Sequence, residues 1–419
     1  MTDIAEFKSA LEKGLGRAMI LLRQHSDKPA FQAALLHACQ VNLAYDRQCE
    51  RSRAGYLSRL IRETGQNHAY WVDLVRGFGE LAEGDTRYDK TQIFETLCML
   101  ASHDLSLDRM TLQALMNAAS FDDVDGGAME AFVRLSGIDG LLHCIRRFSA
   151  EMDRSEWILP TLLEALAERD GAEAAAASLR EFRPGCPALD RLMRAMEADR
   201  RPGPPTDTVL DRAMVKASVA RDRRIPFPWI RDASLEDLEW AADELLAEDD
   251  EGRIWVYLRA FGRRDFPRPP ERLFGFVHSH NARIAYSAAR ALGRIGHPEI
   301  RKLALALLAD GEAPAIGLHL LRRNLQSGDF ATIERVLAMA EADAEAVHRL
   351  ELAILNLLDA TPPEESRETL LKLYEIGQCS LCRETVVSKL LALGSVPGWL
   401  MEECRYDADP ETAARFGSA

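Results

Sequence analysis

Four leucines recur at a nearly constant interval in the C-terminal half of the chain. Leu292, Leu325, Leu358 and Leu393 are separated by 33, 33 and 35 residues. Each closes a segment with apolar residues at helical spacing, and each is followed by a turn and a second such segment. A fixed interval of this length, filled by two helices, is typical of stacked helical hairpins, because one hairpin cannot bury its apolar face alone. The interval therefore predicts an all-α chain, an α-solenoid (superhelix) of stacked antiparallel helix pairs.

The same spacing places the predicted helices along the chain. In the C-terminal half, the first helices of the pairs are expected at residues 283–292, 316–325, 349–358 and 383–393, and the second at 300–308, 333–340, 369–374 and 399–404. In the N-terminal half, apolar residues three or four positions apart predict amphipathic helices around residues 56–61, 71–78, 93–100, 112–116, 129–133 and 159–166. The N-terminal half shows no clean repeat interval. Short polar connections indicate antiparallel neighbours throughout.

One stretch of the C-terminal half resembles a known family. Residues 279–299 read SHNARIAYSAARALGRIGHPE, with an arginine after the turn, a pair of alanines and a closing Leu-Gly-x-Ile-Gly. The stretch resembles a HEAT-like repeat of the phycobilisome-lyase type; the resemblance covers residues 270–415 and extends to 1–200 only by analogy. It implies a HEAT-like or ARM-like solenoid. The alanines would let the two helices approach closely, and Gly296 is expected to end its helix in a left-handed conformation.

A proline-rich segment divides the chain. Residues 201–207 read RPGPPTD. Proline lacks the backbone donor that a helix needs and pushes the preceding residue out of the helical region, so no helix is expected to cross this segment. The predicted regions are residues 1–205, an N-terminal helical region of degenerate HEAT-like pairs, and residues 206–419, a C-terminal region of HEAT-like repeats.

Charge and cysteine usage restrict the partner and the compartment. The formal net charge is −14, and an acidic surface repels phosphate backbones, which disfavours nucleic acid as the partner. Residues 1–20 lack a basic stretch followed by a long apolar run, and no apolar run reaches the roughly 20 residues of a membrane span. The eight cysteines lie mostly in apolar helical patterns, which is typical of reduced thiols. A cytoplasmic protein without membrane association is expected.

The best candidate for partner binding is the arginine- and aromatic-rich segment of residues 252–294. It holds nine arginines and seven aromatic residues but only two acids. Arginine and aromatic side chains dominate binding hot spots, and arginine pairs bidentately with carboxylate or phosphate groups. In the alternative interpretation, these arginines neutralise the nine acids of residues 234–251, and several aromatics belong to the core. The predicted partner-binding residues are Arg253, Arg259, Arg263, Arg264, Arg268, Arg272, Trp255 and Phe266.

Two short motifs are similar to metal-binding or redox sites, and each also has a structural interpretation. Cys379-Ser-Leu-Cys382 at a helix start could serve redox chemistry or supply half of a zinc site; no second ligand pair exists, so two partly core-facing cysteines are the favoured interpretation. Residues 122–127 read DDVDGG, but a calcium loop here would put phenylalanines where carboxylates are required. A capping turn before a helix at 128–135 is expected instead. No catalytic residue, cofactor or metal ligand is predicted.

These observations predict a non-enzymatic scaffold or regulator that binds a macromolecular partner, by preference another protein, on a solenoid surface. Two alternatives stay open. HEAT-like alkylpurine DNA glycosylases use aromatic and basic side chains on a concave face, which suggests nucleic-acid binding or glycosylase-like activity. The type of repeat suggests a bilin-lyase-like protein, although fold resemblance alone does not carry an activity. The partner's identity, the oligomeric state and the binding face do not follow from the sequence.

Overall fold

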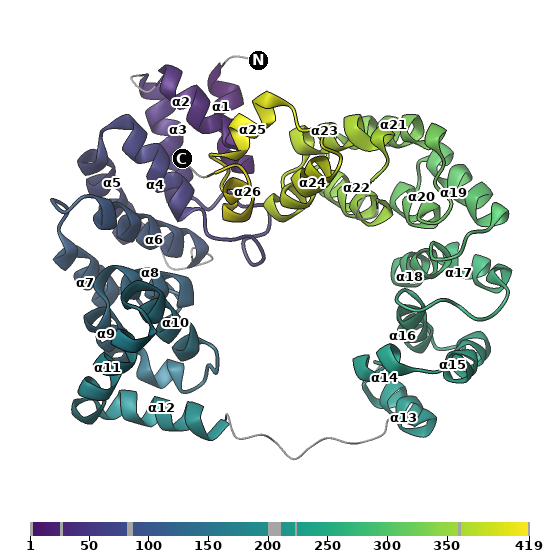
Figure 1. Ribbon diagram of the computed structural model, residues 1–419, viewed down its shortest axis with the longest axis horizontal. Helices are drawn as coiled ribbons and strands as arrows, with labels where there is room; N and C mark the ends of the chain where they lie inside the picture. Colours follow the sequence, from purple (N-terminus) through teal and green to yellow (C-terminus); the bar gives the residue numbers. More distant parts are fainter. Residues whose placement is uncertain are drawn as a thin grey trace. The chain divides into compact units, whose positions relative to one another are not determined.

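The computed structural model describes residues 3–25, 28–81, 87–199, 211–222, 224–358 and 362–417. Within these ranges the chain forms 26 α-helices, four short 3-10 helices and no β-strand (Figure 1). The predicted all-α class is therefore confirmed. None of the helices in these ranges is long and apolar enough to cross a membrane.

The chain forms two compact units. Unit 1 comprises Met1–Pro205, Gln378–Leu381 and Pro397–Ala419, and unit 2 comprises Thr206–Gly377 and Cys382–Val396. Residues 201–207, on which the predicted boundary rests, lie outside the described ranges. The two C-terminal segments of unit 1 were assigned by the sequence analysis to the region 206–419.

Unit 1 consists of helices joined by short connections. They are α1 Asp3–Lys13, α2 Arg17–His25, α3 Pro29–Gln40, α4 Ala54–Thr64, α5 Asn67–Glu80, α6 Arg87–His103, α7 Arg109–Ala118, α8 Gly126–Ser136, α9 Ile138–Met152, α10 Ile158–Asp170, α11 Ala172–Phe182, α12 Pro187–Asp199, α25 Gly398–Cys404 and α26 Pro410–Ala414, with the 3-10 turn Arg183–Gly185 before α12. All six helices predicted in this half are present.

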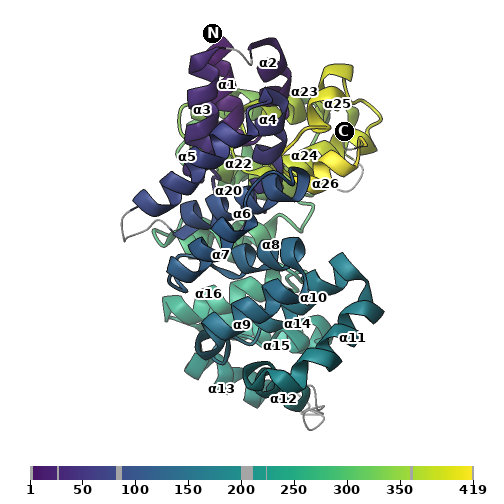
Figure 2. The same ribbon diagram turned by 90° about the vertical axis from the view of Figure 1, so that its left-hand side faces the viewer.

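These helices pack mainly against the next helix or the next but one. α2, α4, α6, α8 and α10 form one continuous row, and α1, α3 and α5 lie along it (Figure 2). Phe94 of α6 and Phe132 of α8 meet edge to face, with ring centres 6.0 Å apart. α6 is the most enclosed element, because every residue from Asp89 to Cys98 is buried. The row thus surrounds α6 with other helices, which brings its polar residues into the interior.

The C-terminal segment of unit 1 packs against the turn between α1 and α2. The Arg17 Nε–H donates to the Glu403 carboxylate at 2.6 Å, and the Ala408 N–H donates to the Gly14 carbonyl at 2.9 Å. A Cβ atom added at Gly16 would lie 1.8 Å from the Glu403 carbonyl oxygen. Residues almost 400 positions apart are therefore in contact within this unit, and only glycine fits at position 16.

Unit 2 contains most of the helices predicted in the C-terminal half. Its helices are α13 Arg212–Asp222, α14 Phe227–Asp232, α15 Leu235–Ala247, α16 Glu251–Phe261, α17 Phe274–Val277, α18 Ala282–Leu292, α19 Pro298–Asp310, α20 Pro314–Leu321, α21 Phe330–Ala340, α22 Ala344–Leu357 and α23 Arg367–Ile376, with 3-10 turns at Pro270–Leu273, Ser327–Asp329 and Glu364–Ser366. α24, Ser380–Ala392, begins in unit 1 and continues in unit 2. α18 to α25 correspond to the eight helices predicted in the C-terminal half.

Two rows of helices make up most of unit 2. α16, α18, α20 and α22 form one row, and α19, α21 and α23 form the other (Figure 1). Side-chain caps define several helix starts: Ser234 and Asp237 form a capping box at α15, and Asn281 and Asp343 accept backbone N–H groups at α18 and α22. Local packing of helix pairs is therefore observed.

One predicted helix end is wrong. α20 ends at Leu321 instead of residue 325. The chain turns early because the Asn324 amide donates to the carbonyls of Ile295 and Leu320, each at 3.0 Å. The Arg323 N–H also donates to the Gly293 carbonyl at 3.1 Å. These bonds fasten the end of α20 to the turn after α18.

The predicted left-handed cap at Gly296 is also wrong. α18 ends at Leu292, and Gly296 does not have a positive φ. The glycine that the packing requires is Gly293, since a Cβ there would lie 1.9 Å from the carbonyl oxygen of His319 in α20. Close approach of α18 and α20 requires the glycine, rather than an unusual backbone conformation.

We expect Gly16→Ala to destabilise unit 1 by ~1–3 kcal/mol, because the added methyl group would push Glu403 away from the α1–α2 turn. Gly55→Ala in α4 is the matched control, since a Cβ there meets nothing within 4 Å. That control should be neutral or stabilising by up to ~1 kcal/mol. Urea unfolding of both variants measures the difference. Equal stabilities would show that the C-terminal segment does not pack on this turn.

Candidate functional site

α16 and the turn after it carry five of the eight predicted binding residues. Trp255, Arg259 and Arg263 recur every fourth residue through α16 and the turn after it, and Tyr286 and Arg290 recur at the same interval on α18. Residues four apart share one face of a helix, and α16 packs directly against α18. Two ladders of arginine and aromatic side chains therefore lie on adjacent helices.

Each arginine of these ladders lies over an aromatic ring. The guanidinium carbons of Arg259 and Arg283 are 4.9 and 5.3 Å from the ring centre of Trp255. Arg263 lies 5.0 Å from the ring centre of Phe227, and Arg290 lies 5.9 Å from that of Tyr286. These are cation–π distances. The seven residues are called the arginine–aromatic surface: Phe227, Trp255, Arg259, Arg263, Arg283, Tyr286 and Arg290.

The four arginines of this surface are exposed. Within the described ranges, none of them is hydrogen-bonded or ion-paired to a carboxylate through its guanidinium. A guanidinium stacked on a ring keeps its N–H edge directed outward, where it can bind a carboxylate or phosphate bidentately. The arginine–aromatic surface is therefore prepared for an anionic group from outside the chain.

Two other predicted binding arginines neutralise nearby acids. Arg253 lies 3.2 Å from the carboxylate of Glu248, at the end of the acidic segment. Arg268 binds Asp243 with two hydrogen bonds of 2.9 and 2.7 Å, which lower the pKa of that carboxyl. For Arg253 and Arg268, the structure agrees with the alternative interpretation, in which the arginines neutralise the acids of residues 234–251.

Phe266 and Arg272 stand apart from the surface. Phe266 is buried, and its ring meets that of Phe261 edge to face with the centres 5.0 Å apart. This contact makes Phe266 a core residue. Arg272 is exposed, in the 3-10 turn before α17.

Arg264 has a structural role. Its guanidinium donates to the carbonyl oxygens of Ile230, Arg231 and Ala233, at 2.7, 2.9 and 2.9 Å. The last carbonyls of a helix have no partner within it, so Arg264 caps the C-terminal end of α14. The adjacent Arg263 points to Phe227 instead.

Arg264→Ala should lower the stability of unit 2 by ~1–3 kcal/mol, since charge-assisted bonds to three carbonyls are lost. Arg263→Ala is the matched neighbour and should leave the unfolding free energy nearly unchanged. Urea unfolding of the two single variants separates the roles. Similar losses in both would mean that Arg263 is structural as well.

Hollows lie at both ends of the arginine–aromatic surface. At one end, a cavity of about 510 Å³ is lined by Phe227, Ile230, Val256 and the rim arginines Arg259 and Arg263. At the other, an apolar groove of about 600 Å³ begins at Tyr286 and runs between α18, α20, α21 and α22. The surface thus joins exposed cations to two hollows that can take side chains.

Tyr286 is held by a neutral histidine. Its ring meets that of His319 edge to face, with ring centres 4.8 Å apart. Burial, together with repulsion from the nearby Arg290 and Arg322, lowers the pKa of His319 to about 4. His319 therefore supports the aromatic ring near neutral pH without adding charge to the surface.

Unit 1 contains a polar pocket of about 320 Å³ that the sequence analysis did not identify. It lies between the α3–α4 connection, the first half of α6 and the start of α8. Its floor holds the buried side chains of Thr91, Gln92 and Glu95, and exposed arginines lie around it. Polar groups line a pocket that enters the interior of the unit.

Two buried oxygen atoms of residues that line the pocket have no hydrogen-bond partner among the residues that the structure describes. Gln92 is 2% exposed, and its amide nitrogen donates to the carbonyls of Ala38, Cys39 and Val41. These bonds fix the orientation of the amide, so Oε1 accepts no hydrogen bond. The hydroxyl of Thr91, a residue 8% exposed, is unpartnered too. Buried polar atoms are normally satisfied, but neither oxygen has a surface that a molecule in the pocket can reach.

Glu95 lies beside these two residues. Burial raises the pKa of its carboxyl to about 7, and repulsion from Asp125 and Glu130 adds to the shift. The hydroxyl of Ser52 donates to the Glu95 carboxylate, which opposes the shift. The floor can therefore exchange a proton near neutral pH.

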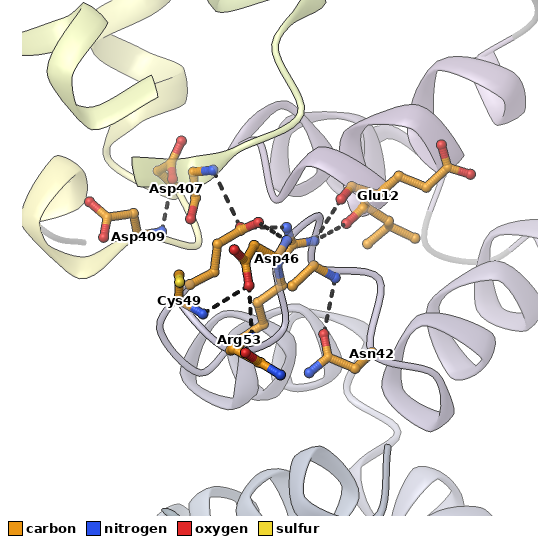
Figure 3. Close-up of polar contacts among 12 residues, drawn as sticks. Glu12, Asn42, Asp46, Cys49, Arg53, Asp407 and Asp409 are labelled. Carbon is orange, nitrogen blue, oxygen red and sulfur yellow. Dashed lines mark hydrogen bonds and ion pairs between the residues drawn. The ribbon is translucent and has the colours of Figure 1, made fainter. Parts of the chain in front are cut away.

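The connection between α3 and α4 lines the pocket. Its backbone is held by polar contacts of its own side chains (Figure 3). The Asp46 carboxylate accepts the N–H groups of Gln48 and Cys49, at 3.0 and 3.1 Å. The Asn42 side chain accepts the N–H of Ala44 at 3.0 Å. Such local caps replace the bonds of a regular helix, so this connection is ordered by its own side chains.

A buried ion pair closes this connection. Arg53 lies 3.1 Å from the Glu50 carboxylate, and both side chains are almost fully buried. Arg53 also donates to the carbonyls of Leu11 and Glu12, at 3.1 and 2.7 Å, which caps the C-terminal end of α1 (Figure 3). Burial opposes ionisation, but Arg53 and the hydrogen bonds to the carboxylate outweigh it and lower the pKa of Glu50.

Stability should fall with rising pH because of Glu95. The pKa of Glu95 is about 7 in the folded state and about 4.3 in the unfolded state. The neutral carboxyl therefore contributes stability below the unfolded-state pKa, and this stability is lost as pH rises through the folded-state pKa. The side chain of the Glu95→Gln variant cannot ionise. Between pH 5 and 8, the free energy of unfolding of this variant should therefore fall by about 2–3 kcal/mol less than that of the wild type. Urea unfolding at both pH values measures this. The exposed Glu164→Gln should behave as wild type; an identical pH dependence in Glu95→Gln would contradict the assignment.

The two cysteines of the CxxC motif are both buried. Cys379 belongs to unit 1 and Cys382 to unit 2. In unit 2, the Cys382 sulfur lies 3.8 Å from His348 Nδ1, and the same nitrogen lies 3.4 Å from the Glu351 carboxylate. Burial raises the pKa of Glu351, and His348 opposes this shift. The predicted core-facing placement of the cysteines agrees with their burial.

The predicted capping turn before residues 128–135 is confirmed. Asp125 accepts the N–H groups of Gly127 and Ala128 and starts α8. This aspartate also lines the polar pocket.

Comparisons of the chain with protein-family models, with curated proteins and with solved structures each gave no match. The HEAT-like resemblance therefore stays a prediction. The function has to be argued from the two sites themselves.

The polar pocket was missed because its buried polar residues lie at the start of the helix predicted at 93–100 and just before it. Thr91, Gln92 and Glu95 precede or alternate with the apolar residues of α6 and would be assigned to the solvent face. One signal was available in the sequence, because six polar residues of α6 occupy more than one face of the helix. The structure buries all six. They are Asp89, Lys90, Thr91, Gln92, Glu95 and Thr96.

Proposed function

We propose that the chain is a non-enzymatic binding protein whose arginine–aromatic surface docks an acidic segment of another protein. The observation that carries the proposal is the set of four exposed arginines, each over an aromatic ring and none paired with a carboxylate in the described ranges. In a chain of net charge −14, acids are plentiful enough to neutralise these arginines. Cations that remain unneutralised are available to an external anion.

We further propose that the helix pairs stack as a HEAT-like α-solenoid. Rows in which each helix contacts the next but one, such as α16, α18, α20 and α22, support it. The interval of 33 to 35 residues between pairs is that of known solenoid repeats. A solenoid offers long surfaces for macromolecular partners, which agrees with a surface that extends over three helices.

The hollows beside the surface favour a peptide segment as its occupant. Carboxylates of the segment would bind Arg259 and Arg283, while apolar side chains would enter the groove that begins at Tyr286 and the cavity beside Phe227. Mixed apolar and charge-assisted contacts of this kind are typical of hot spots. A nucleic acid could also stack on these rings, but the net charge of the chain repels a long phosphate backbone.

The proposal is tested with a fluorescein-labelled peptide of alternating glutamate and leucine, measured by anisotropy at low salt. Arg259→Gln with Arg283→Gln should weaken peptide binding about tenfold or more. The two arginines over the Trp255 ring would no longer make charge-assisted contacts with glutamates of the peptide. The matched control is Arg154→Gln with Arg180→Gln, two exposed arginines of unit 1. It changes the net charge equally and should leave the affinity unchanged.

Three results would overturn the proposal. The first is equal weakening in both double variants, which would indicate a general charge effect. The second is equal binding of a peptide with lysine in place of glutamate. The third is tighter binding of an oligothymidylate of the same charge, which would favour the nucleic-acid function instead.

A further inference from the structure

Three side chains that commonly bind metal ions meet in unit 2, away from the arginine–aromatic surface. His348 and Glu351 are three residues apart on α22 and therefore share one face of that helix. Cys382, in the part of α24 that belongs to unit 2, lies against His348. The sequence offered only the cysteines of the CxxC motif as ligands, whereas the structure adds an imidazole and a carboxylate.

The distances between these side chains match those between ligands of one zinc ion. Cys382 Sγ lies 3.8 Å from His348 Nδ1, and the same nitrogen lies 3.4 Å from the Glu351 carboxylate. Zinc binds sulfur at about 2.3 Å and imidazole nitrogen or carboxylate oxygen at about 2.0–2.2 Å. In a tetrahedral site these bond lengths place sulfur and nitrogen about 3.6 Å apart, and nitrogen and oxygen about 3.4 Å apart. The two observed distances agree with this geometry to within a few tenths of an ångström.

The carboxylate of Glu351 calls for a cation beside it. The side chain is fully buried, and its Oε1 has no hydrogen-bond partner among the described residues. Burial raises the pKa of the Glu351 carboxyl, and His348, Arg383 and the Cys382 thiol oppose this rise without cancelling it. Buried charges are normally paired or bound to a metal ion. A divalent ion at Oε2, the oxygen that faces His348, would offset the cost of burial and need not reach Oε1.

His348 gives the group an edge toward solvent. Its side chain is 23% exposed, whereas Cys382 is only 5% exposed. An ion can therefore enter along the imidazole and then be held by the buried thiol and carboxylate. Sulfur, nitrogen and oxygen donors together favour zinc, because calcium and magnesium take oxygen ligands.

We propose that unit 2 binds one zinc ion through Cys382 Sγ, His348 Nδ1 and the Glu351 carboxylate. Cys379 stands three residues before Cys382 in the sequence, and cysteines at this spacing supply two ligands in many zinc sites. The spacing therefore assigns Cys379 as the fourth ligand. Each thiol loses its proton to solvent when the ion binds. The ion links α22 to α24 and thereby stabilises the end of unit 2.

Zinc titration of the full chain tests the proposal. The protein, prepared without a polyhistidine tag, is reduced and freed of metal with EDTA, and zinc chloride is added in competition with a chromophoric chelator. The wild type should bind one ion per chain, and zinc should raise its melting temperature, because the ion binds the folded state. Cobalt(II) in place of zinc should show a thiolate-to-metal charge-transfer band and the visible bands of a tetrahedral site.

Single variants locate the ion. Cys382→Ser and His348→Gln should each weaken zinc binding about tenfold or more, and Cys382→Ser should also weaken the charge-transfer band. The matched controls should bind as the wild type does. They are Cys186→Ser in unit 1, which is also 5% exposed, and His280→Gln, an exposed histidine of unit 2. Cys49→Ser tests for adventitious binding, since Cys49 is exposed.

The proposal is overturned if the reduced wild type binds no zinc at one ion per chain, or if the cobalt spectrum lacks the charge-transfer band. It also fails if His348→Gln binds zinc as tightly as the wild type. Binding that is lost in Cys49→Ser but kept in Cys382→Ser would indicate an adventitious ion only. Should Cys382→Ser not fold, His348→Gln decides, because its side chain is partly exposed. None of these outcomes depends on the acidic-peptide assay.

Discussion

The buried pair of Glu50 and Arg53 holds together the parts of unit 1 that are far apart in sequence. Arg53 caps the end of α1, and Glu50 accepts the backbone N–H groups of Asp46 and Ser380. Leaving one partner of a buried pair unpaired costs on the order of 3–5 kcal/mol. The contact of Ser380 with the α3–α4 connection, and the order of that connection beside the polar pocket, both depend on this pair.

Arginine serves three separate purposes in this chain. Arg53 and Arg264 satisfy backbone carbonyls at helix ends, and Arg268 neutralises an acidic helix. Arg259 and Arg283 are left on a tryptophan ring with their hydrogen-bonding edges exposed. Composition treats these residues alike, but their surroundings make the first two groups part of the fold and leave the third without a carboxylate partner in the described ranges.

The two candidate sites differ in exposure and in composition. The arginine–aromatic surface is exposed and combines cations and rings with a hollow on either side. The polar pocket is lined by buried polar side chains and by exposed arginines.

The sequence by itself determined the helical class and the positions of most helices. The leucine interval and the three- and four-residue periodicity are local properties, and they placed α18 to α25 to within a few residues except at the end of α20. Local pattern also found the arginine–aromatic segment. Local pattern could not show that Arg263 and Arg264 have different roles. The two differ in what their side chains contact, which is the ring of Phe227 for Arg263 and the end of α14 for Arg264.

Only the tertiary structure decided which residues far apart in the chain meet. The segment after residue 397 joins the N-terminal helices through Gly16 and Glu403, a contact that no repeat pattern encodes. Burial of polar residues in α6 likewise depends on the helices packed around it, so the pocket formed by Thr91, Gln92 and Glu95 has no sequence motif. Helix formation depends on neighbours in sequence. Neighbours in space decide which charges are neutralised, which side chains are buried and which hydrogen-bonding groups lack a partner.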